Sequence, residues 1–243
     1  MDTTLDGLLN RRVTFEQPAS GYRVAIDTVL LAAAVEAKAG DRVLDLGCGV
    51  GGALLCLAAR VPHISVTGID IQEPLVAVCI RNIERNKFQA HMDVVVGDAQ
   101  KVSVDGFDYV MMNPPYHDEV SHDVSRDKIK RTANTEKDGD LELWIKSASK
   151  ALKPAGVMAL IHRADRLMEI MRYTEPLFGQ IEVLSLLPKA GAEPKRVIVR
   201  AQKGYEKSVI LCRPLVLHKE AGGYTDAADD ILRHAKALAF EAT

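Results

Sequence analysis

Short apolar runs alternate with amphipathic segments over most of the chain. Seven runs rich in Val, Ile and Leu have the length of strands: residues 42–46, 65–70, 93–97, 107–112, 157–161, 181–187 and 196–202. Segments of helical composition follow several of them: residues 53–60, 74–86, 141–152 and 165–173. Strands that are separated by helices pair in parallel through right-handed crossovers, and uninterrupted apolar runs fit strands buried on both faces. The pattern predicts an α/β fold with a doubly wound, mostly parallel, seven-stranded sheet.

The two ends of this pattern differ from its middle. No helix separates the last two runs, so we expect them to form an antiparallel hairpin at one edge of the sheet. Residues 1–39 precede the first run and carry one helical segment, at 28–38. We therefore expect an N-terminal extension over 1–39 and a single domain over 40–243, a length typical of α/β folds. Residues 117–138 are polar without periodicity, and a loop this long is usually functional or disordered.

Composition narrows the class of protein. Of the 243 residues, 47% are hydrophobic and 26% are charged, which excludes disordered, collagen-like and coiled-coil proteins. No apolar run approaches the roughly 18 residues of a membrane span, and the first six residues are too acidic for a signal peptide. The four cysteines form no C-x-x-C pair, and neither they nor the histidines have metal-ligand spacing. We expect reduced thiols, no metal and a cytoplasmic location.

A glycine-rich motif, DLGCGVG at residues 45–51, stands between the first strand and a helix. Glycine lets the backbone turn tightly and approach a ligand closely, and the following helix presents partly positive N–H groups. The spacing is neither the dinucleotide G-x-G-x-x-G nor a P-loop. A plain strand–helix turn is the alternative. Asp45, Gly47 and Gly49 are the candidate ligand-binding residues of this motif.

Two further acids end the next two strands. Asp70 ends the second strand, where a carboxylate can accept both hydroxyls of a ribose. Asp98 follows the third strand and can accept a hydrogen bond from an adenine amino group. Alone, Asp70 could be a helix N-cap and Asp98 a turn residue. Because ligands of open α/β sheets bind at the carboxyl ends of the strands, the three acids together favour a nucleotide-like ligand.

The most specific motif is Asn113-Pro114-Pro115-Tyr116, directly after the fourth strand. Two prolines fix the backbone and remove two N–H donors, and the first one restricts Asn113 to extended conformations. A rigid set of acceptors remains, formed by the Asn113 side-chain oxygen and the Pro114 carbonyl, with Tyr116 adding an aromatic face. Such a site suits a planar substrate that carries an NH2 group.

Together these motifs resemble the class I S-adenosylmethionine-dependent methyltransferases, in the branch that methylates exocyclic or amide nitrogens. Residues 21–32, 69–72, 163–167 and 223–225 also resemble segments of the bacterial tRNA(valine) adenine-N6 methyltransferase family, and the similarity runs from about residue 15 to 232. The resemblance implies the cofactor S-adenosyl-L-methionine, with the extension capping its pocket. It implies these cofactor-binding residues: Arg23, Asp45, Gly47, Gly49, Asp70, Ile71, Asp98, Ala99 and Asn113. It implies these catalytic residues: Asn113, Pro114 and Tyr116.

The same resemblance implies that the methyl group goes to adenine N6 in tRNA. Methylation of a protein glutamine amide, or of a small molecule (including an oxygen), is the alternative. A net charge of −2 is low for a strong tRNA binder, but basic residues gather at 126–131 and 189–213, where RNA phosphates could bind. Solvated strand edges would explain both patches equally well. The sequence leaves monomer and dimer open.

Overall fold

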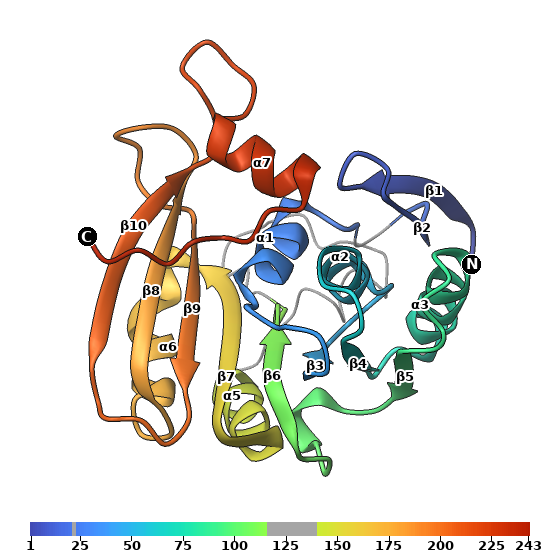
Figure 1. The fold of residues 1–243 in the computed structure, drawn as a ribbon, viewed down its shortest axis with the longest axis horizontal. Helices are drawn as coiled ribbons and strands as arrows, with labels where there is room; N and C mark the ends of the chain where they lie inside the picture. The colour runs from blue at the N-terminus through green and yellow to red at the C-terminus, as the bar shows by residue number, and fades with distance from the viewer. Residues whose placement is uncertain (21–22, 116–139) are drawn as a thin grey trace, which may run out of the picture.

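The computed structural model describes residues 1–20, 23–115 and 140–243. Its main sheet has eight strands in the order β10-β8-β9-β7-β6-β3-β4-β5 (Figure 1). Their bounds are β3 Arg42–Leu46, β4 Ser65–Asp70, β5 Met92–Val96, β6 Phe107–Met112, β7 Leu152–Arg163, β8 Gly179–Leu187, β9 Arg196–Gln202 and β10 Val209–Val216. Strands β7, β6, β3, β4 and β5 are parallel, and β9 is antiparallel to both β7 and β8.

The predicted doubly wound, mostly parallel sheet is confirmed, but it has eight strands rather than seven. The last two predicted strands, β8 and β9, are antiparallel as expected, yet the strand at the edge is β10, which pairs in parallel with β8. Strand β10 carries Pro214, and its register shifts between Cys212 and Leu215. Proline is tolerated in edge strands and at bulges. Residues 209–216 therefore form a strand although Pro214 interrupts their apolar run.

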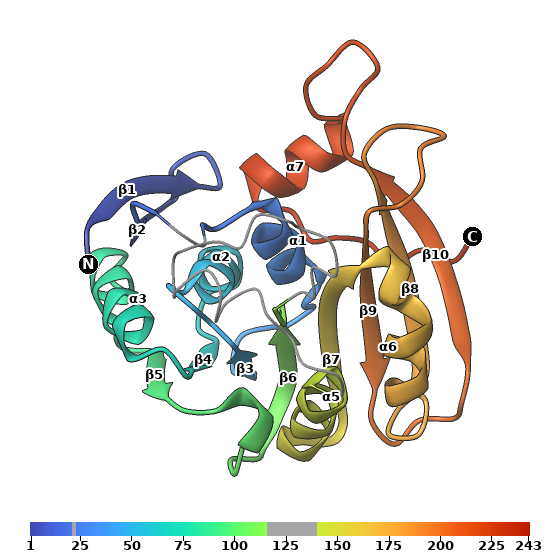
Figure 2. The same cartoon turned by 180° about the vertical axis from the view of Figure 1, so that it is seen from behind.

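Helices cover both faces of the sheet (Figures 1 and 2). Their bounds are α1 Ile26–Ala34, α2 Gly52–Arg60, α3 Glu73–Arg85, α5 Asp140–Ala151, α6 Leu167–Thr174 and α7 Asp226–His234, with short 3₁₀ turns η1 Ala99–Lys101 and η2 Ala164–Arg166. One apolar core joins α1, α2, α3 and α7 to one face, and a second core joins α5 and α6 to the other. Among the described residues, no helix is long and apolar enough to cross a membrane.

The N-terminal residues form a separate two-stranded sheet of β1 (Thr3–Leu8) and β2 (Val13–Pro18), in addition to the expected helix α1. Asn82 of α3 and Asn86, directly after that helix, bind β2 through hydrogen bonds. The backbone N–H of Glu16 donates to Asn82 Oδ1 at 2.6 Å, and Asn86 Nδ2 donates to the Thr14 carbonyl at 2.7 Å. Asn82 Nδ2 also donates to the Val50 carbonyl at 2.9 Å. This asparagine therefore ties the hairpin to the glycine loop.

Candidate active site

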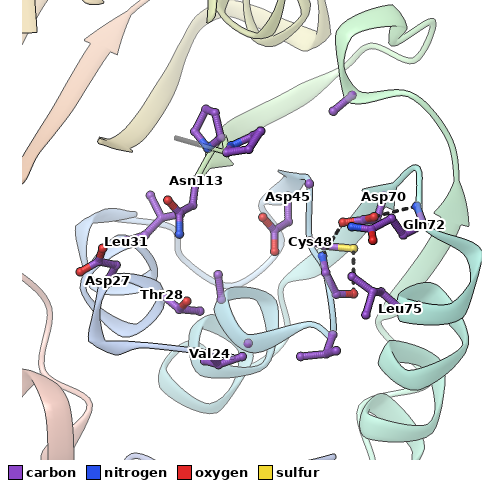
Figure 3. Close-up of a pocket in the computed structure, with 18 of the residues that line it drawn as sticks. Val24, Asp27, Thr28, Leu31, Asp45, Cys48, Asp70, Gln72, Leu75 and Asn113 are labelled. Carbon is purple, nitrogen blue, oxygen red and sulfur yellow. Dashed lines mark hydrogen bonds between the residues drawn. The ribbon is translucent and has the colours of Figure 1, made fainter. Parts of the chain in front are cut away.

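A cavity of about 420 Å³ opens at the carboxyl ends of β3, β4 and β6. Figure 3 shows Asp45 in its middle, with Asn113 on one side and Asp70 on the other. The volume lies in the range of small-molecule sites, and its position at the strand ends is where open α/β sheets bind ligands. Predicted residues that line it are Asp45, Gly47, Gly49, Asp70, Ile71, Asp98, Ala99, Asn113 and Pro114.

The glycine loop turns with positive backbone angles, φ +70° at Gly47 and φ +55° at Gly49. The N–H groups of Gly47 and Cys48 donate to the Ile69 carbonyl at 2.8 and 3.0 Å, which fixes the loop against β4. A Cβ at Gly47 would lie 2.5 Å from Trp144 Cη2, whereas a Cβ at Gly49 would meet nothing within 4 Å. Gly47 is thus needed for packing as well as for φ, while Gly49 borders open space.

Backbone N–H groups fix the carboxylate of Asp70 at the end of β4. Gly49 N–H donates to Oδ2 and Gln72 N–H donates to Oδ1, each at 2.8 Å (Figure 3). Burial raises the pKa of Asp70, and the two N–H donors oppose that rise. A carboxylate oxygen has two acceptor positions, so Asp70 keeps acceptor capacity for a ligand.

Asp45 is more deeply buried, with 2% of its surface exposed. Burial raises its pKa well above the ordinary value, and the nearby charge of Asp70 adds to that rise. Asp45 Oδ2 has no hydrogen-bond partner in the described part of the chain. A buried acceptor without a partner costs free energy, and a ligand that brings a donor or a positive charge would remove that cost.

The third acid, Asp98, caps the 3₁₀ turn η1. Its Oδ1 accepts from Gln100 N–H at 2.9 Å, and its Oδ2 lies 3.1 Å from Lys101 Nζ. The alternative expected for Asp98, a residue of a turn, is therefore correct, and the residue lines the cavity as well. The neighbouring Ala99 is buried, and Ile71 is 61% exposed. An exposed Ile71 is available to cover a flat ligand.

The acceptor motif continues β6. Asn113, Pro114 and Pro115 line the cavity directly after the strand, as the sequence predicted. Tyr116, the motif's last residue, lies outside the described residues. The structure therefore brings Asn113 and Pro114 together with the three acids, whereas the role of Tyr116 stays a prediction.

Arg23 lies away from the cavity lining. Its Nη2 donates to Asp6 Oδ2 at 2.8 Å, and its Nη1 donates to Thr4 Oγ1 and the Pro18 carbonyl at 3.1 and 3.3 Å. The next residue, Val24, does line the cavity. Arg23 ties this segment to the β1–β2 hairpin, and its predicted contact with the cofactor stays a prediction.

Several lining residues were not anticipated as cavity residues, because they come from elements distant in sequence. Thr28 and Leu31 come from α1, Trp144 comes from α5 and Arg196 begins β9. Trp144 is 7% exposed, and its Nε1 has no partner in the described part of the chain. Thr28 and Leu31 lie within residues 21–32, in the extension expected to cap the pocket, and Arg196 is one of the seven basic residues within 189–213. Trp144 carried no signal.

Of the two basic segments, the structure describes residues 189–213 only. Residues 126–131 lie outside the described residues. Within 189–213, Arg200 is buried and paired with Glu36 and Glu182, and Lys203 Nζ donates to the carbonyls of Ser149 and Leu152. Since β9 runs antiparallel to β7, Lys203 lies at the end of the sheet opposite to Arg196. The segment's charges therefore face different parts of the molecule, and RNA binding by these patches stays a prediction.

A model of the methyltransferase small domain family matches residues 19–187. The tRNA1(Val) (adenine(37)-N6)-methyltransferase of Porphyromonas gingivalis is 31% identical over 232 residues, covering 88% of this chain and 89% of the relative. The enzyme of the same name from Glaesserella parasuis is 26% identical, covering 84% of this chain and 85% of the relative.

Solved structures agree on the fold. A protein of Agrobacterium tumefaciens described as a predicted O-methyltransferase has a TM-score of 0.73 at 26% identity, over 88% of this chain and 98% of the other. The T. thermophilus 16S rRNA guanine-N2 methyltransferase, solved with AdoMet and guanosine, has a TM-score of 0.60 at 20% identity, over 83% and 50%. The chain belongs to the methyltransferase small domain family and is an S-adenosyl-L-methionine-dependent methyltransferase.

Proposed function

We propose that this enzyme transfers a methyl group to N6 of an adenine in tRNA. The observation that carries the proposal is the convergence of Asn113 and Pro114 with Asp45, Asp70 and Asp98 on one cavity. The relatives named tRNA1(Val) (adenine(37)-N6)-methyltransferase support the choice of acceptor. A tRNA substrate would in turn place the enzyme in the cytoplasm.

The volume and the acidic lining of the cavity suit S-adenosyl-L-methionine, which carries positive charge on its ammonium and its sulfur. We assign the ribose hydroxyls to Asp70 and the adenine amine to Asp98, and Ile71 and Ala99 would border the adenine ring. The cofactor's ammonium would supply the donor that buried Asp45 Oδ2 lacks among the described residues. The open space beside Gly49 leaves room for the methionine part. When bound, the cofactor supplies an electrophilic methyl group on a positively charged sulfur.

The protein's part in the transfer is to position and polarise the acceptor amine. The lone pair of an adenine amino nitrogen is delocalised into the ring, so the nitrogen is a poor nucleophile. Hydrogen bonds from its two N–H groups to Asn113 Oδ1 and the Pro114 carbonyl would favour a more tetrahedral nitrogen. They would also stabilise the positive charge that develops on it. Tyr116 would stack on the base once the base has turned out of its loop. The proton that the amine loses leaves to water, so no strong general base is needed.

The N-terminal extension, residues 1–39, supplies one wall of this site in our proposal. Val24, Ala25, Asp27, Thr28 and Leu31 all line the cavity. A wall that covers the reacting groups keeps water out and strengthens the electrostatic interactions inside. Arg23 would serve this wall by anchoring it to the hairpin.

A second candidate is methylation of a small-molecule oxygen, which the description of the A. tumefaciens structure favours. An oxygen acceptor has at most one hydrogen to donate, so it would leave one of the two acceptors at Asn113 and Pro114 without a partner. The acceptor pair therefore fits an NH2 group better.

The test is mass spectrometry of nucleosides from the tRNA of a strain that lacks this gene. We expect one N6-methylated adenosine to disappear and to return when the wild-type gene, but not Asn113→Ala, is restored. Unchanged tRNA nucleosides in the deletion strain would contradict the proposal and turn the search to small-molecule or protein acceptors.

A further inference from the structure

The charges around the cavity are strongly unequal. Of the residues that the structure describes, four with carboxyl groups line it: Asp27, Asp45, Asp70 and Asp98. Among the described residues of the lining, Arg196 carries the only cationic side chain. Its side chain is 32% exposed, so a ligand in the cavity can reach it. Arg196 is therefore the residue of the described lining that offers a positive charge to an anionic part of a ligand.

The position of Arg196 is fixed from a distant part of the chain. Arg196 Nε donates to Asp27 Oδ2 at 2.9 Å, and its Nη1 donates to the Lys195 carbonyl at 3.1 Å. Asp27 is in the first turn of α1 and is only 18% exposed. An ion pair between two partly buried groups restricts the guanidinium more than an exposed pair would.

Arg196 lies on the acceptor side of the cavity. The order β9-β7-β6-β3-β4 puts its strand two places from β6, which Asn113 directly follows, and four places from β4, which ends at Asp70. With about 4.8 Å between strands, these separations are roughly 10 Å and 19 Å. Figure 3 agrees, since Asp27 lies on the Asn113 side, away from Asp70.

We infer that Arg196 binds the phosphate of the nucleotide that is being methylated, with Asp27 as the residue that positions it. The inference rests on the proposed function, in which the target amine lies at Asn113. The phosphate of a nucleotide is attached through the ribose, on the far side of the base from N6, so it would reach beyond β6 toward β9. The guanidinium is planar and presents donors in a fork that matches two phosphate oxygens.

Other basic side chains gather at the same end of the sheet. In the β7–β9 ladder Arg163 lies opposite Arg196, and Lys195 N–H donates to the Leu186 carbonyl just before β9. Arg166 follows in η2. Neighbouring phosphates of an RNA strand could pass over these residues. Arg196 differs from them because it lines the cavity itself, so we expect it to act on the flipped nucleotide.

The test compares Arg196→Gln with wild type on unmodified, in vitro transcribed tRNA1(Val). Glutamine keeps an N–H donor for Asp27 but removes the charge. We expect kcat/KM for the transcript to fall about 10- to 100-fold, as for loss of a charge-assisted contact. The slope of log(kcat/KM) against log[salt] should become shallower by about one phosphate contact, a readout that a purely structural role would not move. Cofactor affinity by calorimetry should stay within about twofold of wild type.

Arg233→Gln is the matched control, because Arg233 pairs with Asp229 on α7 and carries the same charge. It should change neither kcat/KM nor the salt slope. Arg196→Lys covers the case in which Arg196→Gln fails to fold. It keeps the charge and the salt slope but should still lower kcat/KM, because it loses the planar fork. Thermal unfolding identifies folded variants.

The possible results distinguish failure of the inference from failure of the proposed function. Unchanged kcat/KM and salt slope in folded Arg196 variants, with active wild type, would overturn the inference and leave the proposed function standing. A tenfold loss of cofactor affinity with an unchanged salt slope would assign Arg196 to the cofactor's carboxylate instead. No methyl transfer by wild-type enzyme would overturn the proposed function and the inference together.

Discussion

The two sides of the cavity are built in different ways. The Asp70 side, formed by Asp45, Asp70 and Asp98, comes from one continuous stretch of alternating strands and helices over residues 42–101. Backbone N–H groups donate to two of the three carboxylates, those of Asp70 and Asp98. The Asn113 side joins Asn113 to Asp27 and Arg196, which are 169 residues apart. If the roles that we propose for the two sides are right, the residues that bind the cofactor are set by local structure, whereas those that recognise the acceptor are brought together by the whole fold.

The largest expected effect tests whether the two sides are functionally separate. Asn113→Ala should lower kcat on tRNA by about 10²-fold or more, by analogy with loss of one group that stabilises transition-state charge. Cofactor affinity should be nearly unchanged, because Asp45, Asp70 and Asp98 remain. Single-turnover methyl transfer and calorimetry measure the two quantities. Full turnover in this variant would mean that Asn113-Pro114-Pro115 is only a turn.

A substitution on the Asp70 side should have the opposite effect, on cofactor affinity and much less on turnover. Asp70→Ala should weaken cofactor binding roughly 10- to 100-fold, since a charge-assisted hydrogen bond contributes about 1.5–3 kcal/mol. Turnover at saturating cofactor should fall far less. Asp70→Asn keeps one acceptor for the N–H groups of Gly49 and Gln72, so it separates loss of charge from loss of loop structure. Unchanged calorimetric affinity in a folded variant would remove Asp70 from this role.

Substitutions at two glycines of the loop at residues 45–51 separate the cost of overpacking from the cost of a left-handed φ. Gly47→Ala should destabilise the fold by about 1–3 kcal/mol from overpacking against Trp144, plus about 1–2 kcal/mol from its left-handed φ. Gly49→Ala has the φ cost alone, because its Cβ would meet open space. Urea unfolding of both variants gives the difference directly. Equal losses would show that Trp144 moves aside without cost.

The smallest expected effect is a pH dependence of stability and of cofactor affinity that comes from protonation of Asp45. Its folded-state pKa is raised, so the folded apoenzyme binds that proton more tightly than the unfolded chain. Stability should therefore fall as pH rises from the unfolded pKa through the folded one, and Asp45→Asn should be more stable than wild type above that window. An ammonium ligand favours the ionised form, so wild-type cofactor affinity should rise with pH, by at most about tenfold per unit.

Denaturation at pH 5 and pH 8, and calorimetry across the same range, measure these two dependences. In Asp45→Asn both contributions should vanish, while binding itself weakens. If wild type and Asp45→Asn have the same pH profiles, Asp45 is ionised throughout and does not exchange a proton with the cofactor.

Hydrophobic patterning was sufficient to predict the bounds of strands that are buried on both faces of the sheet. The strands at 42–46, 65–70 and 107–112 have the predicted bounds, because continuous apolar runs that end in Gly, Asp or Asn leave little choice of register. It failed at the β1–β2 hairpin, where no residue of Thr3–Leu8 is buried, and at β10, where Pro214 interrupts the run. Edge and surface strands depend on partners that sequence patterning does not describe.

The sequence by itself determined where the three acids and the Asn113 motif lie, because each residue is at or just beyond the carboxyl end of a strand and these ends must meet at one edge of the sheet. Only the tertiary structure decided which distant residues complete the cavity. Trp144 against Gly47 and Arg196 against Asp27 depend on how α5 and β9 pack on the sheet, and no local pattern encodes such a contact. Packing also split the basic segment 189–213, burying Arg200 in ion pairs and leaving Arg196 at the cavity.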